Sequence, residues 1–250
     1  MISNTTIERL KSYKIPGFVD ALLMQTKELS YQHLSFDERL TLLVDTEFTR
    51  RTDVRIKNLL KIAKLPTSAC LEEIDFTLQR SLNKTLILEL ASGSWLSSAA
   101  NIIVTGATGV GKTFLACAIA RNLCMLGHSI KFFRTNQFIQ NLIEYSQRGS
   151  LQQAIANLCK TPLLIFDEWL LDQIHTHQAR PLLDLIDMRY QRYSCLFISQ
   201  LPVTSWHSQI SDPTLADAIL DRIVHNSCRL ELSGESIRKL KPNLPSLTYF

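Results

Sequence analysis

The sequence lacks several features that would assign it to a special class of protein. Its six cysteines form no Cys-x-x-Cys pair, and most of them lie within apolar runs. We therefore expect no zinc ribbon, no redox motif and no disulfide framework, but free thiols in a reducing compartment. No window approaches eighteen unbroken apolar residues, and residues 1–6 contain neither a basic region nor an apolar run. These absences predict no secretory leader, no membrane span and a cytoplasmic location.

Charge of one sign is also scarce. Charged residues make up 20% of the 250, the net charge is +4, and 46% of the residues are hydrophobic. That balance is ordinary for a globular protein, and a chain of this length can bury a core without disulfides or metals. The small excess is uneven, because residues 1–65 carry 11 Lys/Arg against 8 Asp/Glu, whereas residues 66–250 carry 16 against 15. The arrangement of the cations therefore matters more than their number.

The first quarter of the chain has a helical pattern. Apolar residues recur at helical spacing between Leu10 and Leu23, with a turn at Pro16-Gly17. The string Ser35-Phe-Asp-Glu38 is a capping box, which predicts a long helix that runs to about Lys64 and is stopped by Pro66. We therefore expect a small all-helical domain over residues 1–66.

Residues 67–250 form the second predicted domain, and from Asn101 short β-branched runs alternate with helical stretches. The expected strands are 101–105, 129–134, 162–166, 195–199 and 229–232. The expected helices are 112–126, 136–147, 150–159, 178–192 and 214–224. This alternation predicts an α/β fold in which helices cover both faces of a parallel five-stranded sheet.

A phosphate-binding loop joins the first predicted strand to the helix that follows it. The string that matches G-x-x-x-x-G-K-[ST] is Gly106-Ala107-Thr108-Gly109-Val110-Gly111-Lys112-Thr113, followed by Phe114. Glycines let backbone N–H groups point inward as an anion nest, and the helix N-terminus adds its positive end. We expect Lys112 to reach the β- and γ-phosphates of ATP and Thr113 to place its hydroxyl on Mg²⁺.

A second acidic element ends a buried strand. Four apolar residues precede Asp167 and Glu168, so the strand delivers both carboxylates to its C-terminal edge. Asp167 is expected to hold Mg²⁺, and Glu168 to orient and deprotonate the attacking water. The strand 129–134 lies between the two motifs in the sequence. That insertion is typical of P-loop ATPases with an additional strand and favours a hydrolase over a small-molecule kinase.

Two further groups are candidates for the same site. Ser199 and Gln200 end the fourth predicted strand, where an ATPase of this kind has a sensor beside the γ-phosphate. Arg222 lies in a later helix and could act as a finger that reaches a neighbouring subunit's nucleotide. The alternative for the strand end is an ordinary turn, and the alternative for Arg222 is a salt bridge with Asp217 or Asp221.

The long N-terminal helix carries a basic face. Arg50, Lys57, Lys61 and Lys64 fall within about 60° of arc at 3.6 residues per turn, and Arg51 and Arg55 lie alongside. Ile56, Leu59, Leu60 and Ala63 occupy the opposite face. Such a row suits the phosphates of duplex DNA and predicts binding that is largely independent of base sequence. The alternative is an ordinary solvated face.

Several longer strings resemble one family, the IstB-like ATP-binding proteins, which are transposition helpers encoded with some bacterial insertion sequences. The most specific strings are Ser199-Gln-Leu-Pro-Val203, Trp206-His207, Asp212-Pro-Thr-Leu-Ala-Asp-Ala-Ile-Leu-Asp-Arg222 and Gly234-Glu-Ser236 with Arg238-Lys239. The resemblance extends over almost the whole chain. It implies an AAA+ ATPase similar to the DnaC helicase loader, without the usual lid, and with Arg238 as a candidate second sensor.

The resemblance also implies partners. These are duplex DNA engaged by the N-terminal domain, further copies of the chain assembled side by side in the presence of ATP, and a cognate transposase. The chain departs from the family at Ala107, where proline is frequent, and at Asp167-Glu168-Trp169-Leu170, which replaces the commoner Asp-Asp-Trp-Gly. Two rival functions stay open, a replicative helicase loader and a nucleotide-gated interaction protein with negligible turnover.

Overall fold

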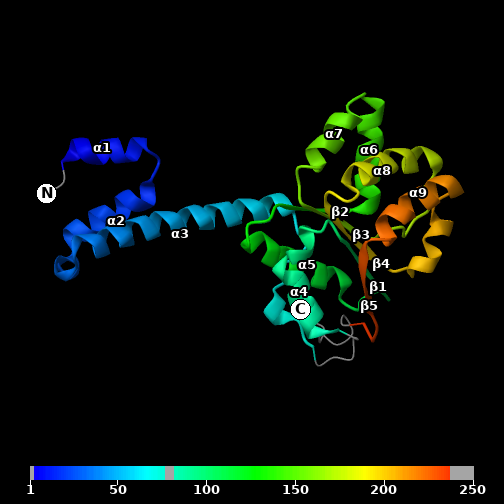
Figure 1. Cartoon of the computed structure of the whole chain (residues 1–250), viewed down its shortest axis with the longest axis horizontal. Helices are drawn as coiled ribbons and strands as arrows, with labels where there is room; N and C mark the ends of the chain where they lie inside the picture. The colour runs from blue at the N-terminus through cyan, green and yellow to red at the C-terminus, as the bar shows by residue number, and fades with distance from the viewer. Residues whose placement is uncertain (1–2, 77–81, 237–250) are drawn as a thin grey trace, which may run out of the picture. The chain divides into compact units, whose positions relative to one another are not determined.

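The computed structural model describes residues 3–76 and 82–236 (Figure 1). The chain groups into two compact units, unit 1 at Met1–Asn58 and unit 2 at Leu59–Phe250, which we describe separately. The division falls inside the long helix α3, Phe36–Ala63, so this helix belongs to both units. The functional boundary after residue 66 stays a prediction.

Unit 1 is helical, as its sequence predicts. It contains α1 (Asn4–Ser12), α2 (Pro16–Lys27), a short 3-10 turn (Leu29–His33) and the first part of α3. The capping box is present, because the Glu38 amide donates to Ser35 Oγ (3.3 Å) and the Ser35 amide donates to Glu38 Oε2 (2.8 Å). The helix ends at Ala63, and Lys64 follows with a φ of +51° just before Leu65-Pro66. The predicted start and end of this helix are therefore confirmed to within a residue.

A buried carboxylate ties α2 to α3 in unit 1. Glu47 is buried and accepts hydrogen bonds from the amides of Gly17 (2.8 Å) and Phe18 (3.3 Å) at the start of α2. The same carboxylate pairs with Arg50 (2.7 Å) and Arg51 (2.6 Å) on its own helix. These charge-assisted bonds hold the pKa of Glu47 well below its usual range, at about 2, with the Arg50 bond as the largest cause.

Unit 2 is built on five parallel strands. They are β1 (Asn101–Gly106), β2 (Ile130–Arg134), β3 (Leu163–Asp167), β4 (Ser194–Ser199) and β5 (Ser227–Leu232). Their order across the sheet is β2-β3-β4-β1-β5, and every neighbouring pair is parallel. The α/β class and all five predicted strands are thus confirmed, with ends that shift by at most two residues.

Helices cover both faces of the sheet (Figure 1). One face packs against α4 (Lys84–Ser92) and α5 (Lys112–Met125), and the other packs against α6 (Thr135–Gln147), α7 (Leu151–Leu158), α8 (Thr176–Arg189) and α9 (Pro213–Val224). Because side chains alternate along a strand, Ile102 and Val104 of β1 join the first core and Ile103 joins the second. Leu59, Leu60 and Ala63, the predicted apolar face of the basic helix, belong to the first core.

The strand order decides which side chains meet. Strand β4 lies between β1 and β3, although β2 is the strand that separates them in the sequence. Parallel strands end at the same edge of a sheet, so the residues that follow β1, β3 and β4 share one crevice. This edge collects the P-loop, the Asp167-Glu168 pair and Gln200.

Candidate nucleotide site

The P-loop adopts a backbone that only glycine supplies easily. Gly106 has a φ of +143°, and a Cβ at this position would lie 2.2 Å from the carbonyl oxygen of Leu232 in the adjacent β5. Gly109 has a φ of +86°, and a Cβ there would lie 2.1 Å from the Ser236 hydroxyl. Both the left-handed backbone and the close approach require glycine, and the loop leads directly into the N-terminus of α5. The result is a cradle for anionic oxygens at a helix N-terminus.

Lys112 brings a cation to this cradle. It is the first residue of α5, it is buried, and its Nζ donates to the carbonyl oxygens of Gly106 (2.7 Å) and Ala107 (2.8 Å). Burial lowers the pKa of the Lys112 ammonium, and the nearby Asp167 carboxylate partly offsets that shift. The side chain is therefore held over the loop, where a phosphate would replace weak carbonyl acceptors by anionic ones.

Thr113 and Asp167 meet across the crevice. The Thr113 hydroxyl donates to Asp167 Oδ2 (3.0 Å), and Asp167 Oδ1 accepts from the Glu168 amide (2.9 Å). The Thr135 hydroxyl fixes the same segment by donating to the Asp167 carbonyl oxygen (2.7 Å). A hydroxyl and a carboxylate are the oxygen ligands that Mg²⁺ takes beside nucleotide phosphates, so this pair fits the metal.

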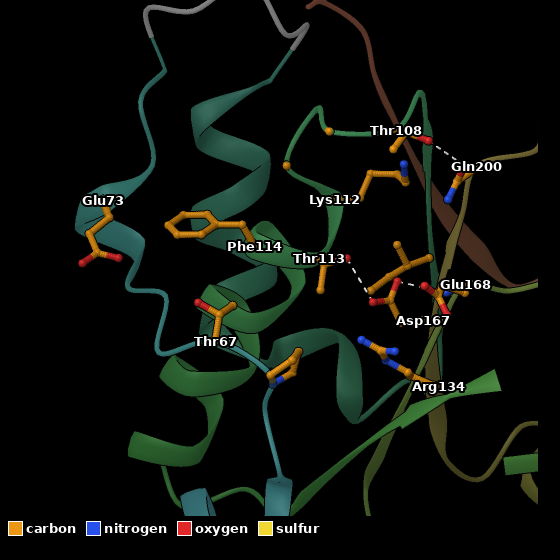
Figure 2. Close-up of a pocket in the computed structure, with 14 residues that line it drawn as sticks. Thr67, Glu73, Thr108, Lys112, Thr113, Phe114, Arg134, Asp167, Glu168 and Gln200 are labelled. Atoms are coloured by element: carbon orange, nitrogen blue, oxygen red, sulfur yellow. Dashed lines mark hydrogen bonds between the residues drawn. The ribbon is translucent and has the colours of Figure 1, made fainter. Parts of the chain in front are cut away.

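These groups line a single pocket of about 740 Å³, shown in Figure 2. At one end the Thr108 hydroxyl donates to Gln200 Oε1 (2.6 Å). Thr67, Glu73 and Phe114 lie toward the other end, away from Gln200. A volume of this size falls within the usual range for a small-molecule or cofactor site.

The predicted sensor is displaced by one residue. Ser199 is buried, its hydroxyl donates to the Trp169 carbonyl oxygen (2.8 Å), and it accepts from the Leu201 amide (3.1 Å). Ser199 therefore does not line the pocket, whereas Gln200 does. The structure corrects the position of the polar group that faces the nucleotide loop, and the sensor role itself stays a prediction.

The segment after β3 carries backbone strain. Glu168 has a φ of +57° and the fully buried Leu170 a φ of +53°, a region that residues other than glycine seldom adopt. Leu170 occupies the position where the sequence departs from the commoner glycine. Trp169 between them is buried and its amide donates to the Ile198 carbonyl oxygen (2.8 Å), which anchors the strained turn to β4.

Arg222 lies away from the P-loop pocket. On α9 it pairs with Asp187 of α8 and donates to the Ala218 carbonyl oxygen (2.7 Å). The predicted alternative partners are wrong, because Asp217 pairs with His207 (3.2 Å) and Asp221 pairs with His225 (3.1 Å). Arg222 also borders a shallow hollow on the surface of α9, so it is accessible to another molecule.

The basic face is less uniform than its spacing predicts. Arg50 and Arg51 pair with Glu47, and Lys64 lies one residue beyond the end of α3, so only three of the four principal cations lie on the helix. That these residues contact DNA stays a prediction. Lys57 and Lys61 are exposed on α3, and within the described residues neither makes an ion pair. Arg55 also lies on the helix and makes an interaction of its own.

Three polar residues of the pocket were missed by sequence reasoning. Arg134 ends β2 in register with Asp167 of β3 and points toward it in Figure 2. The rule that parallel strands end at one edge could have found Arg134. Thr67 and Glu73 come from the segment before the sheet, and no pattern in the sequence indicates that they line the pocket.

The sheet order, the P-loop and the acidic pair together define an AAA+ P-loop ATPase. More specifically, the chain belongs to the IstB-like ATP binding protein family, whose sequence model matches residues 8–244. None of the helices within residues 3–76 and 82–236 is long and apolar enough to cross a membrane. Arg238, the candidate second sensor, lies outside the described residues.

Relatives of known name agree with this assignment. An insertion sequence ATP-binding protein of Sinorhizobium fredii is 38% identical over 241 residues, covering 96% of this chain and 97% of the relative. The insertion sequence IS21 ATP-binding protein of Pseudomonas aeruginosa is 32% identical over 234 residues, covering 93% and 86%.

Solved structures share the fold. DnaI matches with a TM-score of 0.56 at 18% identity, over 68% of this chain and 90% of its own. AMPPCP-bound DnaA from Aquifex aeolicus also matches with a TM-score of 0.56 at 18% identity, over 71% of this chain and 54% of its own. At this identity the likeness concerns the fold alone.

Proposed function

We propose that the chain is an ATP-dependent DNA-binding helper of transposition, which assembles on duplex DNA and recruits or activates a transposase. The observation that carries the proposal is the meeting of the P-loop, Thr113, Asp167 and Glu168 in one pocket of a chain from this family. The relatives' names connect them with insertion sequences, and this supports transposition as the setting.

The chain's own residues divide the chemistry of hydrolysis. Lys112 neutralises the β- and γ-phosphates of ATP, and Thr113 and Asp167 hold Mg²⁺. A Mg²⁺ ion there supplies charge stabilisation at the phosphoryl oxygens. Glu168 accepts a proton from the attacking water and orients it, and Gln200 lies beside the loop as the polar sensor.

Arg222 completes the site of a neighbouring copy in this proposal. It lies outside its own P-loop pocket, and its pair with Asp187 holds the guanidinium while no neighbour is present. Self-association in the presence of ATP would exchange that carboxylate for a neighbour's phosphate. Hydrolysis then depends on assembly. The rate of ATP hydrolysis would in this way set how long the assembly stays on DNA.

Duplex DNA is the proposed ligand of the basic helix. Lys57 and Lys61, with Lys64 just beyond the helix end, offer cations to backbone phosphates. No base-reading pattern accompanies them, so the expected binding is largely independent of base sequence.

The decisive experiment measures ATP hydrolysis with and without duplex DNA. We expect stimulation by DNA of unrelated sequences, and we expect Glu168→Gln to bind ATP without cleaving it and to form long-lived DNA complexes. Wild-type turnover in Glu168→Gln would show that another residue positions the water. Negligible turnover under all conditions would favour the nucleotide-gated interaction protein.

The identity of the protein partner distinguishes the transposition helper from a helicase loader. A pull-down would offer the ATP-bound protein the transposase encoded beside it and a hexameric replicative helicase. Retention of the transposase supports the proposal, and retention of the helicase alone contradicts it.

A further inference from the structure

A second large hollow lies on the open edge of the sheet in unit 2. It measures about 660 Å³ and is formed by β2, α6, α7, the last turn of α3 (Lys61 and Ile62) and Lys64 just beyond it. We call it the β2 groove. Its apolar lining includes Phe132, Phe133, Leu142, Tyr145, Ala154 and Leu158.

The polar rim of the β2 groove is basic. Lys61, Lys64 and Lys131 border it, and no Asp or Glu is among the residues that line it. Within the described residues none of the three lysines makes an ion pair. An apolar groove with a cationic rim fits an amphipathic segment that carries both apolar anchors and carboxylates.

Unit 1 exposes a segment of this kind. Four large apolar side chains recur every four residues along α3 and are exposed by 74%, 39%, 52% and 69%: Phe36, Leu40, Val44 and Phe48. We call them the α3 stripe. Residues four apart on a helix lie on one side of it, so these side chains form a continuous band.

Carboxylates accompany the α3 stripe. At about 100° per residue, Asp37 falls between Val44 and Phe48 in angle, and Asp45 lies about 60° beyond Phe48. Both are exposed, and within the described residues neither is ion-paired. A contiguous exposed apolar band bordered by polar groups marks an interaction site.

We propose that the α3 stripe of one copy docks in the β2 groove of a second copy. The stripe supplies apolar anchors at helical spacing, the groove supplies an apolar floor, and the acids of one face the lysines of the other. In such a dimer, one copy still has a free groove and the other still has a free stripe. The contact is therefore head-to-tail, and further copies can add to both ends. It involves neither the P-loop nor Arg222, so it forms without ATP and goes beyond the proposed function. Lys61 and Lys64 belong both to the rim of the β2 groove and to the proposed DNA surface, so DNA and a second copy compete for these two lysines.

The test uses two variants of the full chain that damage opposite halves of the contact. The stripe variant carries Val44→Glu and Phe48→Glu, both at exposed positions. The groove variant carries Ala154→Trp and Lys131→Glu. Sedimentation velocity without nucleotide or DNA should show concentration-dependent association of the wild type and at least tenfold weaker association of each variant.

An equimolar mixture of the two variants decides the proposal. The groove variant has an intact stripe and the stripe variant an intact groove, so the mixture should form 1:1 dimers and nothing larger. Leu42→Glu, an exposed position on another face of α3, is the matched control and should associate as the wild type does.

Three results would overturn the proposal. They are a monomeric mixture of two variants that are folded by circular dichroism and bind ATP, wild-type association of either variant, and a wild type that stays monomeric at every concentration. The last would include the case in which the stripe binds DNA or a transposase instead. None of these results bears on DNA-stimulated hydrolysis, which tests the proposed function.

Discussion

The two units differ in how much apolar surface they bury. Among the described residues, unit 1 buries only Val19 and Leu43 as apolar side chains, whereas unit 2 has a core on each face of its sheet. Nine of the fifteen exposed large apolar side chains nevertheless belong to unit 1. Apolar burial is the main favourable term in folding, so unit 1 depends on other interactions to a degree that unit 2 does not.

The Glu47 network and the capping box are those other interactions. Both are directional polar interactions, and they leave apolar surface of unit 1 exposed. In unit 2, by contrast, polar side chains such as Lys112, Thr113 and Asp167 line the nucleotide pocket. The comparison indicates that unit 2 carries the nucleotide site on a scaffold with two apolar cores, and that unit 1 has little apolar core and exposes much of its apolar surface.

The largest expected effect lies in unit 2 and requires two copies. Neither Lys112→Ala nor Arg222→Ala should hydrolyse ATP alone, because an arginine finger contributes about 10³–10⁵ in rate. A mixture should recover activity, since an intact P-loop in one copy can meet an intact Arg222 from the other. Steady-state phosphate release measures both. Full activity of Arg222→Ala alone would reduce the residue to a structural partner of Asp187.

The next effect concerns Gln200, the residue now proposed as the sensor. Gln200→Ala should lower the rate of hydrolysis by about 10–100-fold, the equivalent of one hydrogen bond to a charged group. ATP affinity should change much less, because Lys112 and the loop amides remain. Single-turnover kinetics and nucleotide titration separate the two quantities. A loss of affinity equal to the loss of rate would make Gln200 a binding residue instead.

The end of strand β4 illustrates what the sequence could not predict. The strand and its polar end were predictable from the β-branched run, but whether Ser199 or Gln200 faces the crevice depends on the turn that bonds Ser199 to Trp169. The partner of Arg222 was missed for a similar reason. Asp187 lies on another helix, and sequence spacing exposes only partners within one helix.

Unit 1 was harder to predict than unit 2. The capping box is local, and it was found. Glu47 is one acid among several on a charged helix, and its role depends on the amide of Gly17, thirty positions away. The P-loop and acidic pair were found because their chemistry demands a fixed local string, whereas a tertiary hydrogen bond demands none.

A smaller effect concerns DNA. Each phosphate contact contributes about −0.9 to the slope of log affinity against log salt, so Lys57→Gln should flatten that slope by about one. Lys160→Gln is the matched control, since Lys160 is exposed in unit 2, outside both the basic helix and the residues that line the β2 groove, and it should leave the slope unchanged. Fluorescence anisotropy on two unrelated duplexes measures both. An unchanged slope for Lys57→Gln would assign this lysine to the solvated face.

As the pH is lowered, unit 1 should unfold before unit 2. The folded pKa of Glu47 is about 2 against an ordinary value of 4.5, so its contribution to stability is present above pH 4.5 and is lost as the pH falls toward 2. All three tryptophans, Trp95, Trp169 and Trp206, lie in unit 2. Helical circular dichroism should therefore decline at a higher pH than tryptophan fluorescence. Glu47→Gln should remove that early decline, and coincident transitions would contradict the comparison.

The smallest effect tests the local interactions of unit 1. Ser35→Ala removes the cap that holds the Glu38 amide, and such a loss costs about 1 kcal/mol. The freed amide can still reach water, so α3 should persist and only open more often. One kcal/mol corresponds to about a fivefold change in population, so amides of α1, α2 and the first turns of α3 should exchange with deuterium several times faster.

Ser150 is the matched control, because it precedes α7 in unit 2 without a side-chain capping bond. Ser150→Ala should leave exchange in both units close to wild type. Amides of the central strand β1 should also be unaffected by Ser35→Ala, since a small core opens independently of a large one. If Ser35→Ala accelerated exchange in β1 as much as in α2, the two units would open together, and their difference in buried apolar surface would have no consequence for local stability.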